Sequence, residues 1–185
     1  MNLAKRIMTG IVGLAAVVTL AACGSTGSTS NSPTADASDG TGGSAPAGTA
    51  TSGDGKTIVV YWSGTGNTQQ MAEAIANQAH ADLFAASEFT ADKAANYDAF
   101  AFGCSAMGAE QLEEDEFEPM WNAVAPVLGS KKVVLFGSYG WGGGEWMDIW
   151  KRDNAGLNIV DTVICQDAPD DDALAACRAA ADKLA

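Results

Sequence analysis

Short apolar runs alternate with helical patterns along residues 56–185, and this alternation restricts the chain to few folds. The apolar runs cover residues 57–62, 83–86, 99–103, 132–138 and 158–164. Apolar residues recur at helical spacing in the segments that follow the runs, at residues 69–80, 91–95, 116–128, 145–154 and 170–184. Strands that alternate with crossover helices form parallel sheets. The sequence therefore predicts an α/β fold in which helices cover both faces of a parallel sheet.

The beginning of the chain has the character of an export signal. Two basic residues precede an apolar stretch at residues 7–20, and the tetrapeptide Leu-Ala-Ala-Cys ends at Cys23. This tetrapeptide resembles the bacterial lipobox, in which the chain is cut before the cysteine and the cysteine receives diacylglycerol and a further acyl chain such as palmitate. An ordinary secretory signal that contains a cysteine is the alternative. We expect a signal peptide over residues 1–22 and a lipid anchor on Cys23, on the extracytoplasmic side of the cell membrane.

Residues 24–55 are almost wholly Gly, Ser, Thr, Ala, Asp and Pro. Without aromatic or large aliphatic side chains, such a segment cannot bury enough apolar surface to fold by itself. We therefore expect residues 23–55 to be the lipidated cysteine with a flexible tether. Residues 56–185 are then long enough to form one domain with its own core.

The chain is strongly acidic, with a formal net charge of −13 and a calculated pI of about 4.2. Nucleic acid is not an expected partner, because its phosphates would repel this charge. A protein partner with a basic docking face is expected, since opposite surface fields speed encounter. Solubility alone also explains a charge of this size.

The segment Tyr-Trp-Ser-Gly-Thr-Gly-Asn-Thr, residues 61–68, joins the first apolar run to the first helical pattern. Backbone N–H groups, hydroxyls and the positive end of a following helix can together bind a phosphate. The lysine of a P-loop is missing, and Gln69 stands where the dinucleotide fingerprint requires a third glycine. The segment therefore favours a phosphate site of another kind over a turn that binds nothing.

Two further loops follow predicted strands at the same edge of the sheet, where parallel sheets bind their ligands. They are Gly-Cys-Ser-Ala-Met-Gly-Ala-Glu at residues 103–110 and Tyr-Gly-Trp-Gly-Gly-Gly-Glu-Trp at residues 139–146. Met107 and Trp141 are large, polarizable side chains among small residues. Two such groups across a gap predict a slot for a flat aromatic ring, and ordinary core packing of both is the alternative.

These motifs resemble those of the flavodoxins, most closely the short-chain type of anaerobic bacteria. The similar segments are Ser-Gly-Thr-Gly-Asn-Thr at residues 63–68, Gly-Cys-Ser-Ala-Met-Gly at 103–108 and Leu-Phe-Gly-Ser-Tyr-Gly-Trp-Gly at 135–142. The resemblance implies a flavodoxin-like three-layer sandwich with five parallel strands in the order 2-1-3-4-5. It also implies a monomer that binds FMN non-covalently and passes single electrons between redox proteins, without catalytic residues or a metal.

The resemblance carries over to single residues. Ser63, Thr65, Asn67 and Thr68, with the backbone of Gly64 and Gly66, would hold the phosphate. Trp141 would stack on one face of the flavin, Met107 would lie against the other, and Glu110 would accept a hydrogen bond from flavin N3–H. The remaining expected contacts with FMN are Ser105, Ala106, Gly108, Ala109, Ser138, Tyr139, Gly140, Gly142, Gln166 and Asp167, the last two after the fifth strand.

In flavodoxins the peptide after this methionine, here Gly108–Ala109, turns over when the flavin takes up one electron. Glycine at the first central position suits a type II′ turn, which needs a positive φ there. The loops contain no basic residue, so negative charge on a fully reduced flavin is opposed and a low potential is expected.

Two other functions stay open at this point. The first is a flavodoxin-like NAD(P)H-dependent quinone or flavin reductase, although Trp141 would cover the ring face that a nicotinamide must approach. The second is a flavin-binding lipoprotein without a redox partner. The electron carrier is the preferred interpretation, and it is not an enzyme.

Overall fold

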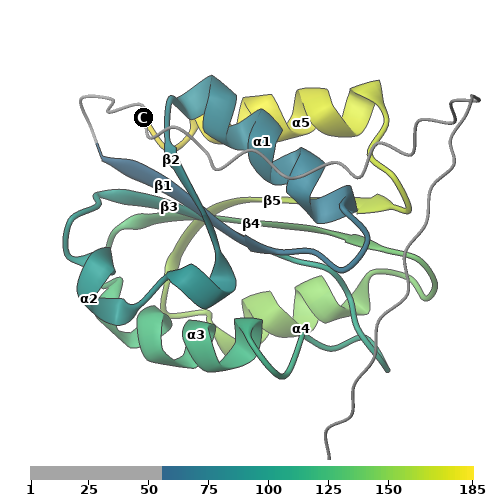
Figure 1. The fold of residues 1–185 in the computed structure, drawn as a ribbon, viewed down its shortest axis with the longest axis horizontal. Helices are drawn as coiled ribbons and strands as arrows, with labels where there is room; N and C mark the ends of the chain where they lie inside the picture. The colour runs from purple at the N-terminus through teal and green to yellow at the C-terminus, as the bar shows by residue number, and fades with distance from the viewer. Residues whose placement is uncertain (1–55) are drawn as a thin grey trace, which may run out of the picture. The chain divides into compact units, whose positions relative to one another are not determined.

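A five-stranded parallel sheet forms the centre of the domain, with its strands in the order β2-β1-β3-β4-β5. The structure, a computed structural model, describes residues 56–185 (Figure 1). The predicted signal peptide (1–22), the lipidated Cys23 and the tether (23–55) lie outside the described residues. The strands are β1 (Thr57–Trp62), β2 (Asp82–Ala85), β3 (Ala99–Cys104), β4 (Lys132–Tyr139) and β5 (Asn158–Gln166).

Helices cover both faces of this sheet, which makes three layers (Figure 1). On one face lie α1 (Asn67–Ala79) and α5 (Asp171–Asp182), and on the other lie α3 (Phe117–Val124) and α4 (Glu145–Asp153). A short helix, α2 (Ala91–Ala94), follows β2 and a 3-10 turn at Ala86–Glu88. The predicted fold class and strand order are confirmed.

The central strands supply both apolar faces of the sheet, because successive side chains of a strand point to opposite sides. Val59 packs with the residues of α1 and α5, whereas Ile58 and Val60 pack with those of α3 and α4. All residues of β3 are buried, as expected for a strand covered on both faces.

Three strands extend one or two residues farther than the sequence predicts, to Cys104, Tyr139 and Gln166. The reason is pairing with a parallel neighbour, which continues through Trp62↔Cys104 and Tyr139↔Gln166. Gln166 is therefore the last residue of β5, whereas the sequence predicts that it follows this strand. At the same edge α1 begins at Asn67, two residues before the predicted start.

The helix predicted over residues 116–128 is wrong in its second half. It ends at Val124 and continues as a 3-10 turn, Ala125–Val127. Pro126 explains this end, because proline has no N–H and its ring clashes with the carbonyl four residues earlier in an α-helix.

Candidate functional site

Three loops meet at the carboxyl edge of the sheet, after the adjacent strands β1, β3 and β4. We call residues 63–66 the first loop, residues 105–111 the second loop and residues 140–144 the third loop. The first loop leads into α1 and the third into α4. The parallel order of these strands thus brings together segments that are far apart in the sequence.

The first loop presents the positive end of a helix to solvent. Gly66 caps α1 in the left-handed region, with a φ of 87°, and no side chain caps this helix. The Ser63 hydroxyl accepts a hydrogen bond from the Gly66 N–H at 3.0 Å, while Gly64 and Thr65 are exposed. The first N–H groups of a helix have no partner within it, and the first turn of α1 holds no Asp or Glu. This end of α1 fits a phosphate without any lysine.

Thr68 lies beneath the first loop and is fully buried. Its Oγ1 lies 2.8 Å from the Ser105 hydroxyl and 3.2 Å from the Ser138 hydroxyl, and it accepts a hydrogen bond from the Ser138 N–H at 3.3 Å. The resemblance of residues 63–68 to the flavodoxin loop places Thr68 among the residues that would bind the phosphate. The structure directs its hydroxyl toward Ser105 of the second loop and Ser138 near the end of β4.

The second loop carries Met107, whose side chain is 39% exposed. Hydrogen bonds of 2.8 and 2.9 Å join the backbones of Met107 and Gln111, and the three residues between them form the tip. Gly108 and Glu110 have φ angles of 48° and 59°. The positive φ predicted for Gly108 is confirmed, and the hydrogen bonds that close the tip join residues four apart, Met107 and Gln111.

The third loop exposes Trp141 to 64% and is joined to the second loop through Glu110. The Glu110 carboxylate accepts hydrogen bonds from the Trp146 N–H at 3.0 Å and the Gly144 N–H at 3.4 Å. A Cβ on Gly142, whose φ is 85°, would lie 1.7 Å from the Glu110 Oε1. Glycine at position 142 therefore lets the two loops close on each other. The carboxylate keeps lone pairs for a further donor.

The other predicted contacts border these loops. The Ala106 N–H donates to the Ser138 carbonyl at 2.9 Å, and the Asp167 N–H donates to the Tyr139 carbonyl at 2.8 Å. Asp167 also lies beside the third loop, because a Cβ on Gly140 would be 3.7 Å from its Oδ1. Gln166 and Asp167 are exposed at the end of β5.

Large apolar side chains are expected inside a protein, so their exposure in two neighbouring loops is informative. Met107 and Trp141 are both exposed, and neither belongs to the core clusters. The alternative, that both are ordinary core residues, is thereby excluded. Next to an uncapped helix end, two such groups suit a ligand with a flat ring and a phosphate.

The electrostatics of this edge come from carboxylates. Hydrogen bonds from its own N–H and from the Gly143 N–H lower the pKa of the exposed Glu145. Burial raises the pKa of Glu113, but hydrogen bonds from the N–H groups of Phe117, Glu116 and Asp115 outweigh it, so this pKa is lowered.

Glu113 was given no role from the sequence, although it fixes the start of α3 beside the second loop. Its carboxylate accepts those three bonds at 2.8 to 2.9 Å. An acidic residue just ahead of a predicted helix is the sequence pattern that could have revealed it.

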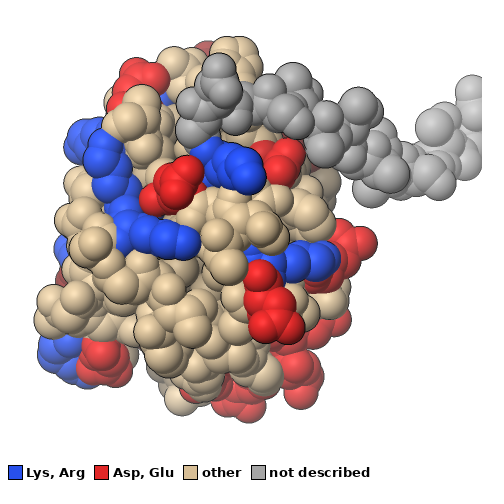
Figure 2. Space-filling model, turned by 90° about the vertical axis from the view of Figure 1, so that its left-hand side faces the viewer, with Lys and Arg blue, Asp and Glu red and all other residues tan. Residues whose placement is uncertain are grey.

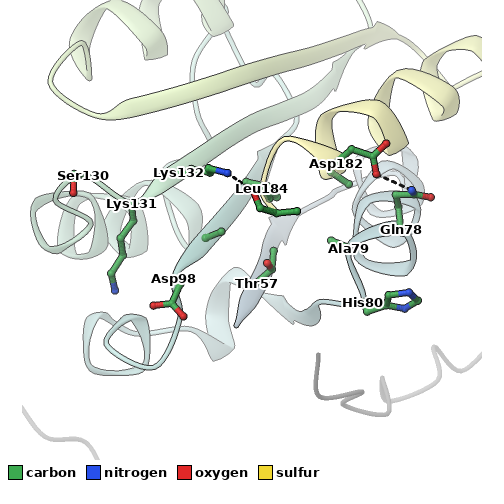
Figure 3. A pocket seen from close by; sticks show the side chains of 13 residues that line it. Thr57, Gln78, Ala79, His80, Asp98, Ser130, Lys131, Lys132, Asp182 and Leu184 are labelled. Atoms are coloured by element: carbon green, nitrogen blue, oxygen red, sulfur yellow. Dashed lines mark hydrogen bonds between the residues drawn. The ribbon is translucent and has the colours of Figure 1, made fainter. Parts of the chain in front are cut away.

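A separate hollow of about 680 Å³ lies at the opposite end of the sheet (Figure 3). Lys131, Lys132 and His80 are among the residues that line it. The Lys131 amine already donates to the carbonyls of Ala94 and Tyr97. The hollow shares no residue with the three loops and is not part of the candidate site.

Two further findings concern residues 56–185 only. They contain no cluster of three or more His, Cys, Asp or Glu side chains placed to hold a metal ion. None of their helices combines the length and the apolar character needed to cross a membrane.

The sequence and the structure are similar to those of known proteins. The flavodoxin family model matches residues 59–180. Flavodoxins of Megasphaera elsdenii and Clostridium beijerinckii are each 46% identical, over 119 and 121 residues; the alignments cover 60% and 61% of this chain and 87% and 88% of those proteins.

Solved structures agree with this similarity. The solution structure of two-electron reduced Megasphaera elsdenii flavodoxin superposes with a TM-score of 0.62 and 40% identity, over 68% of this chain and 98% of that one. A flavodoxin from the domain Archaea gives a TM-score of 0.60 with 27% identity, over 70% and 95% of the two chains. The loop motifs, the strand order and these relatives together establish that the chain belongs to the flavodoxin family.

Proposed function

We propose that the protein is a low-potential carrier of single electrons that uses non-covalently bound FMN and is anchored by lipid to the extracytoplasmic side of the membrane. Flavodoxins bind FMN and transfer electrons. The observation that carries the proposal for this chain is the convergence of three loops at one edge. They unite the uncapped end of α1 with the exposed Met107 and Trp141.

Each part of FMN has residues suited to hold it. The hydroxyls of Ser63 and Thr65 and the first N–H groups of α1 would bind the phosphate. Trp141 and Met107 would cover the two faces of the ring and keep water from it. Bound there, FMN would supply an acceptor and donor of single electrons.

The charge of the site supports a low potential. The three loops contain no Lys or Arg, and Glu110 and Glu145 lie at the third loop. Each negative charge added to the ring would be repelled by these carboxylates. Full reduction is therefore opposed more strongly than it is in water.

The distribution of charge on the domain supports a protein partner with a basic docking face. Residues 105–118, 139–148 and 166–172, all at the carboxyl edge, include many Asp and Glu residues but no Lys or Arg. Lys and Arg side chains gather at the amino ends of the strands, the face seen in Figure 2. A partner with a basic docking face would be steered to the edge that holds the cofactor.

The lipid anchor is supported by the lipobox-like tetrapeptide Leu-Ala-Ala-Cys that ends at Cys23. The Lys56 carbonyl accepts a hydrogen bond from the Asp98 N–H at 2.8 Å, at the amino ends of β1 and β3. The described chain thus begins at the end of the sheet opposite to the three loops.

A stepwise reductive titration of the purified protein tests the carrier. We expect bound FMN in a one-to-one ratio, two separate one-electron steps in the visible spectrum, and no oxidation of added NAD(P)H. A single two-electron step would contradict the carrier, and rapid NAD(P)H oxidation would favour a reductase.

Cell fractionation tests the anchor independently. Cys23→Ser is expected to release the protein from the membrane fraction, because two acyl chains provide most of the membrane affinity. An unchanged membrane fraction in this variant would contradict lipid anchoring and leave the FMN site unaffected.

A further inference from the structure

We propose that the groove between α3 and α4 binds an extended segment of a partner protein in which Lys or Arg flanks a large apolar side chain. The groove lies on one face of the sheet (Figure 1), and only one of its ends reaches the second loop. The inference goes beyond the proposed electron transfer and does not depend on bound FMN.

Two hollows make up this groove, one of about 490 Å³ and one of about 420 Å³. They adjoin, because Asp153 and Asn154 line both of them. The first hollow begins at residues 109–112 of the second loop, and the second reaches the 3-10 turn after α3 and the segment after α4. A groove that follows two helices in this way suits a chain segment better than a compact small molecule.

Two tryptophans of α4, Trp146 and Trp150, line the first hollow and are almost fully buried. The indole Nε1 of each has no hydrogen-bond partner among residues 56–185. Buried polar groups of proteins are nearly always paired, and an indole nitrogen can only donate. Edge-to-face contacts with Phe117 and Trp121 of α3 hold the Trp150 ring in place. The two donors therefore suit a ligand that brings acceptors, such as the carbonyl groups of a peptide backbone.

The first hollow also combines apolar and acidic side chains. Ile149 of α4 is 39% exposed there, although large apolar side chains usually lie inside a protein. Glu114 and Glu118 are exposed at its rim, and neither forms an ion pair within the part of the chain that the structure describes.

The charge of the groove is therefore negative and largely uncompensated. Asp153 is paired with Arg152, but no Lys, Arg or His among the described residues lines either hollow. A segment with basic side chains on either side of an apolar one complements this groove, because opposite charges at a rim select a partner and orient it.

Two synthetic peptides test the proposal on the purified protein. The probe is acetyl-Lys-Leu-Lys-Leu-Lys-amide, and acetyl-Glu-Leu-Glu-Leu-Glu-amide is its acidic counterpart. Proton–nitrogen correlation spectra follow the indole N–H signals, which move when these groups donate a hydrogen bond. We expect the basic peptide to shift the signals of Trp146 and Trp150 with a Kd below about 1 mM, and to leave that of Trp141 unchanged. The acidic peptide should shift none of them.

Ile149→Ser removes the exposed apolar side chain and is expected to raise the Kd of the basic peptide about fivefold or more. Ile164→Ser in β5 is the matched control, since Ile164 is 40% exposed and lines neither hollow. Its Kd should stay within about twofold of the wild-type value.

The double variant Glu114→Gln with Glu118→Gln removes two charges of the rim and should raise the Kd about threefold at low salt. Its control is Glu73→Gln with Glu88→Gln, which removes two exposed carboxylates outside the groove and should leave the Kd within about twofold.

Equal Kd values for Ile149→Ser and Ile164→Ser would overturn the inference. It would also be overturned if the basic peptide moved neither the Trp146 nor the Trp150 signal, or moved only that of Trp141 in the third loop. Shifts of the Trp146 and Trp150 signals that depend on protein concentration, without peptide, would assign the groove to a second copy of this chain and so overturn it as well.

Discussion

Single residues determine whether the three loops can approach one another. Gly142 leaves room for the Glu110 carboxylate, which in turn binds the N–H groups of Trp146 and Gly144. Thr68, in the first turn of α1, contacts Ser105 of the second loop and Ser138 near the end of β4. At this scale the site depends on the absence of a side chain at one position and on a buried hydroxyl at another.

Gly142→Ala is expected to weaken FMN binding by about tenfold or more, because the new Cβ would displace Glu110 and the positive φ would cost about 1 to 2 kcal/mol. Titration of the apoprotein with FMN measures the effect. Gly156→Ala is the control, since a Cβ at that exposed position meets nothing within 4 Å. Equal FMN affinities for the two variants would contradict the assigned role of Gly142.

At the scale of elements, helix starts and strand ends build the site. The strands end in register at the carboxyl edge, and α1 and α4 begin there. Glu113 accepts hydrogen bonds from the N–H groups of Asp115, Glu116 and Phe117, the first residue of α3, and so ties the end of the second loop to that helix. Aromatic side chains then hold α3 on the sheet. Phe102 and Trp121 pack edge to face, with their ring centroids 5.1 Å apart.

Glu113→Gln is expected to destabilise the protein by about 1 to 3 kcal/mol at neutral pH, since a carboxylate that receives three N–H bonds loses its charge. The folded pKa of Glu113 is lowered, so its stabilisation is present above the unfolded pKa, near 4.5. It is lost as the pH falls through the folded pKa.

Urea unfolding between pH 7 and pH 3 measures this difference. The gap between the wild type and Glu113→Gln should narrow as the pH falls below about 4.5, because the carboxylate of the unfolded chain takes up a proton before that of the folded protein. Glu114→Gln, at the exposed neighbouring position, should change stability little at any pH. A gap that is constant across the range would exclude the charge as its cause.

Phe102→Ala should cost about 3 to 5 kcal/mol of unfolding free energy, because it removes a fully buried ring between β3 and α3. Chemical denaturation measures the loss. Val127→Ala, at a position that is 52% exposed, should stay within about 0.5 kcal/mol of the wild type. A small effect of Phe102→Ala would mean that this contact does not hold α3 in place.

At the scale of the whole molecule, charge is unevenly distributed. The segments 105–118, 139–148 and 166–172 at the carboxyl edge contain Asp and Glu but no Lys or Arg. Basic side chains gather at the amino ends of the strands (Figure 2). The parallel topology creates this separation, because every strand end and every helix start of the site lies at one edge.

Electron transfer from the reduced holoprotein to cytochrome c, used as a basic probe, should slow roughly tenfold between low and high ionic strength, because salt screens the attraction. Stopped-flow absorbance measures the rate. In the double variant Glu114→Gln with Glu118→Gln, the rate of electron transfer should depend less on salt than it does in the wild type. In Asp98→Asn, at the opposite end of the sheet, the salt dependence should equal that of the wild type. Equal salt dependence in all three proteins would contradict docking at the acidic edge.

Much of the fold was predictable from local patterns. The apolar runs and helical spacing located every strand and helix of residues 56–185, since both patterns arise from short-range geometry. The ends were less predictable. Gln166 belongs to β5 only because Tyr139 pairs with it, and the helix from Phe117 stops early because of Pro126.

Local sequence patterns were enough to predict the fold class, the loops that form the site, and the pair Met107 and Trp141, because glycine spacing and apolar periodicity are local properties. The contacts of the Thr68 hydroxyl with Ser105 and Ser138, and the closure of the second loop at Gln111, were not predictable in this way. These contacts join residues from different strands and loops. Their partners are selected by the register of the folded sheet, which no local pattern encodes.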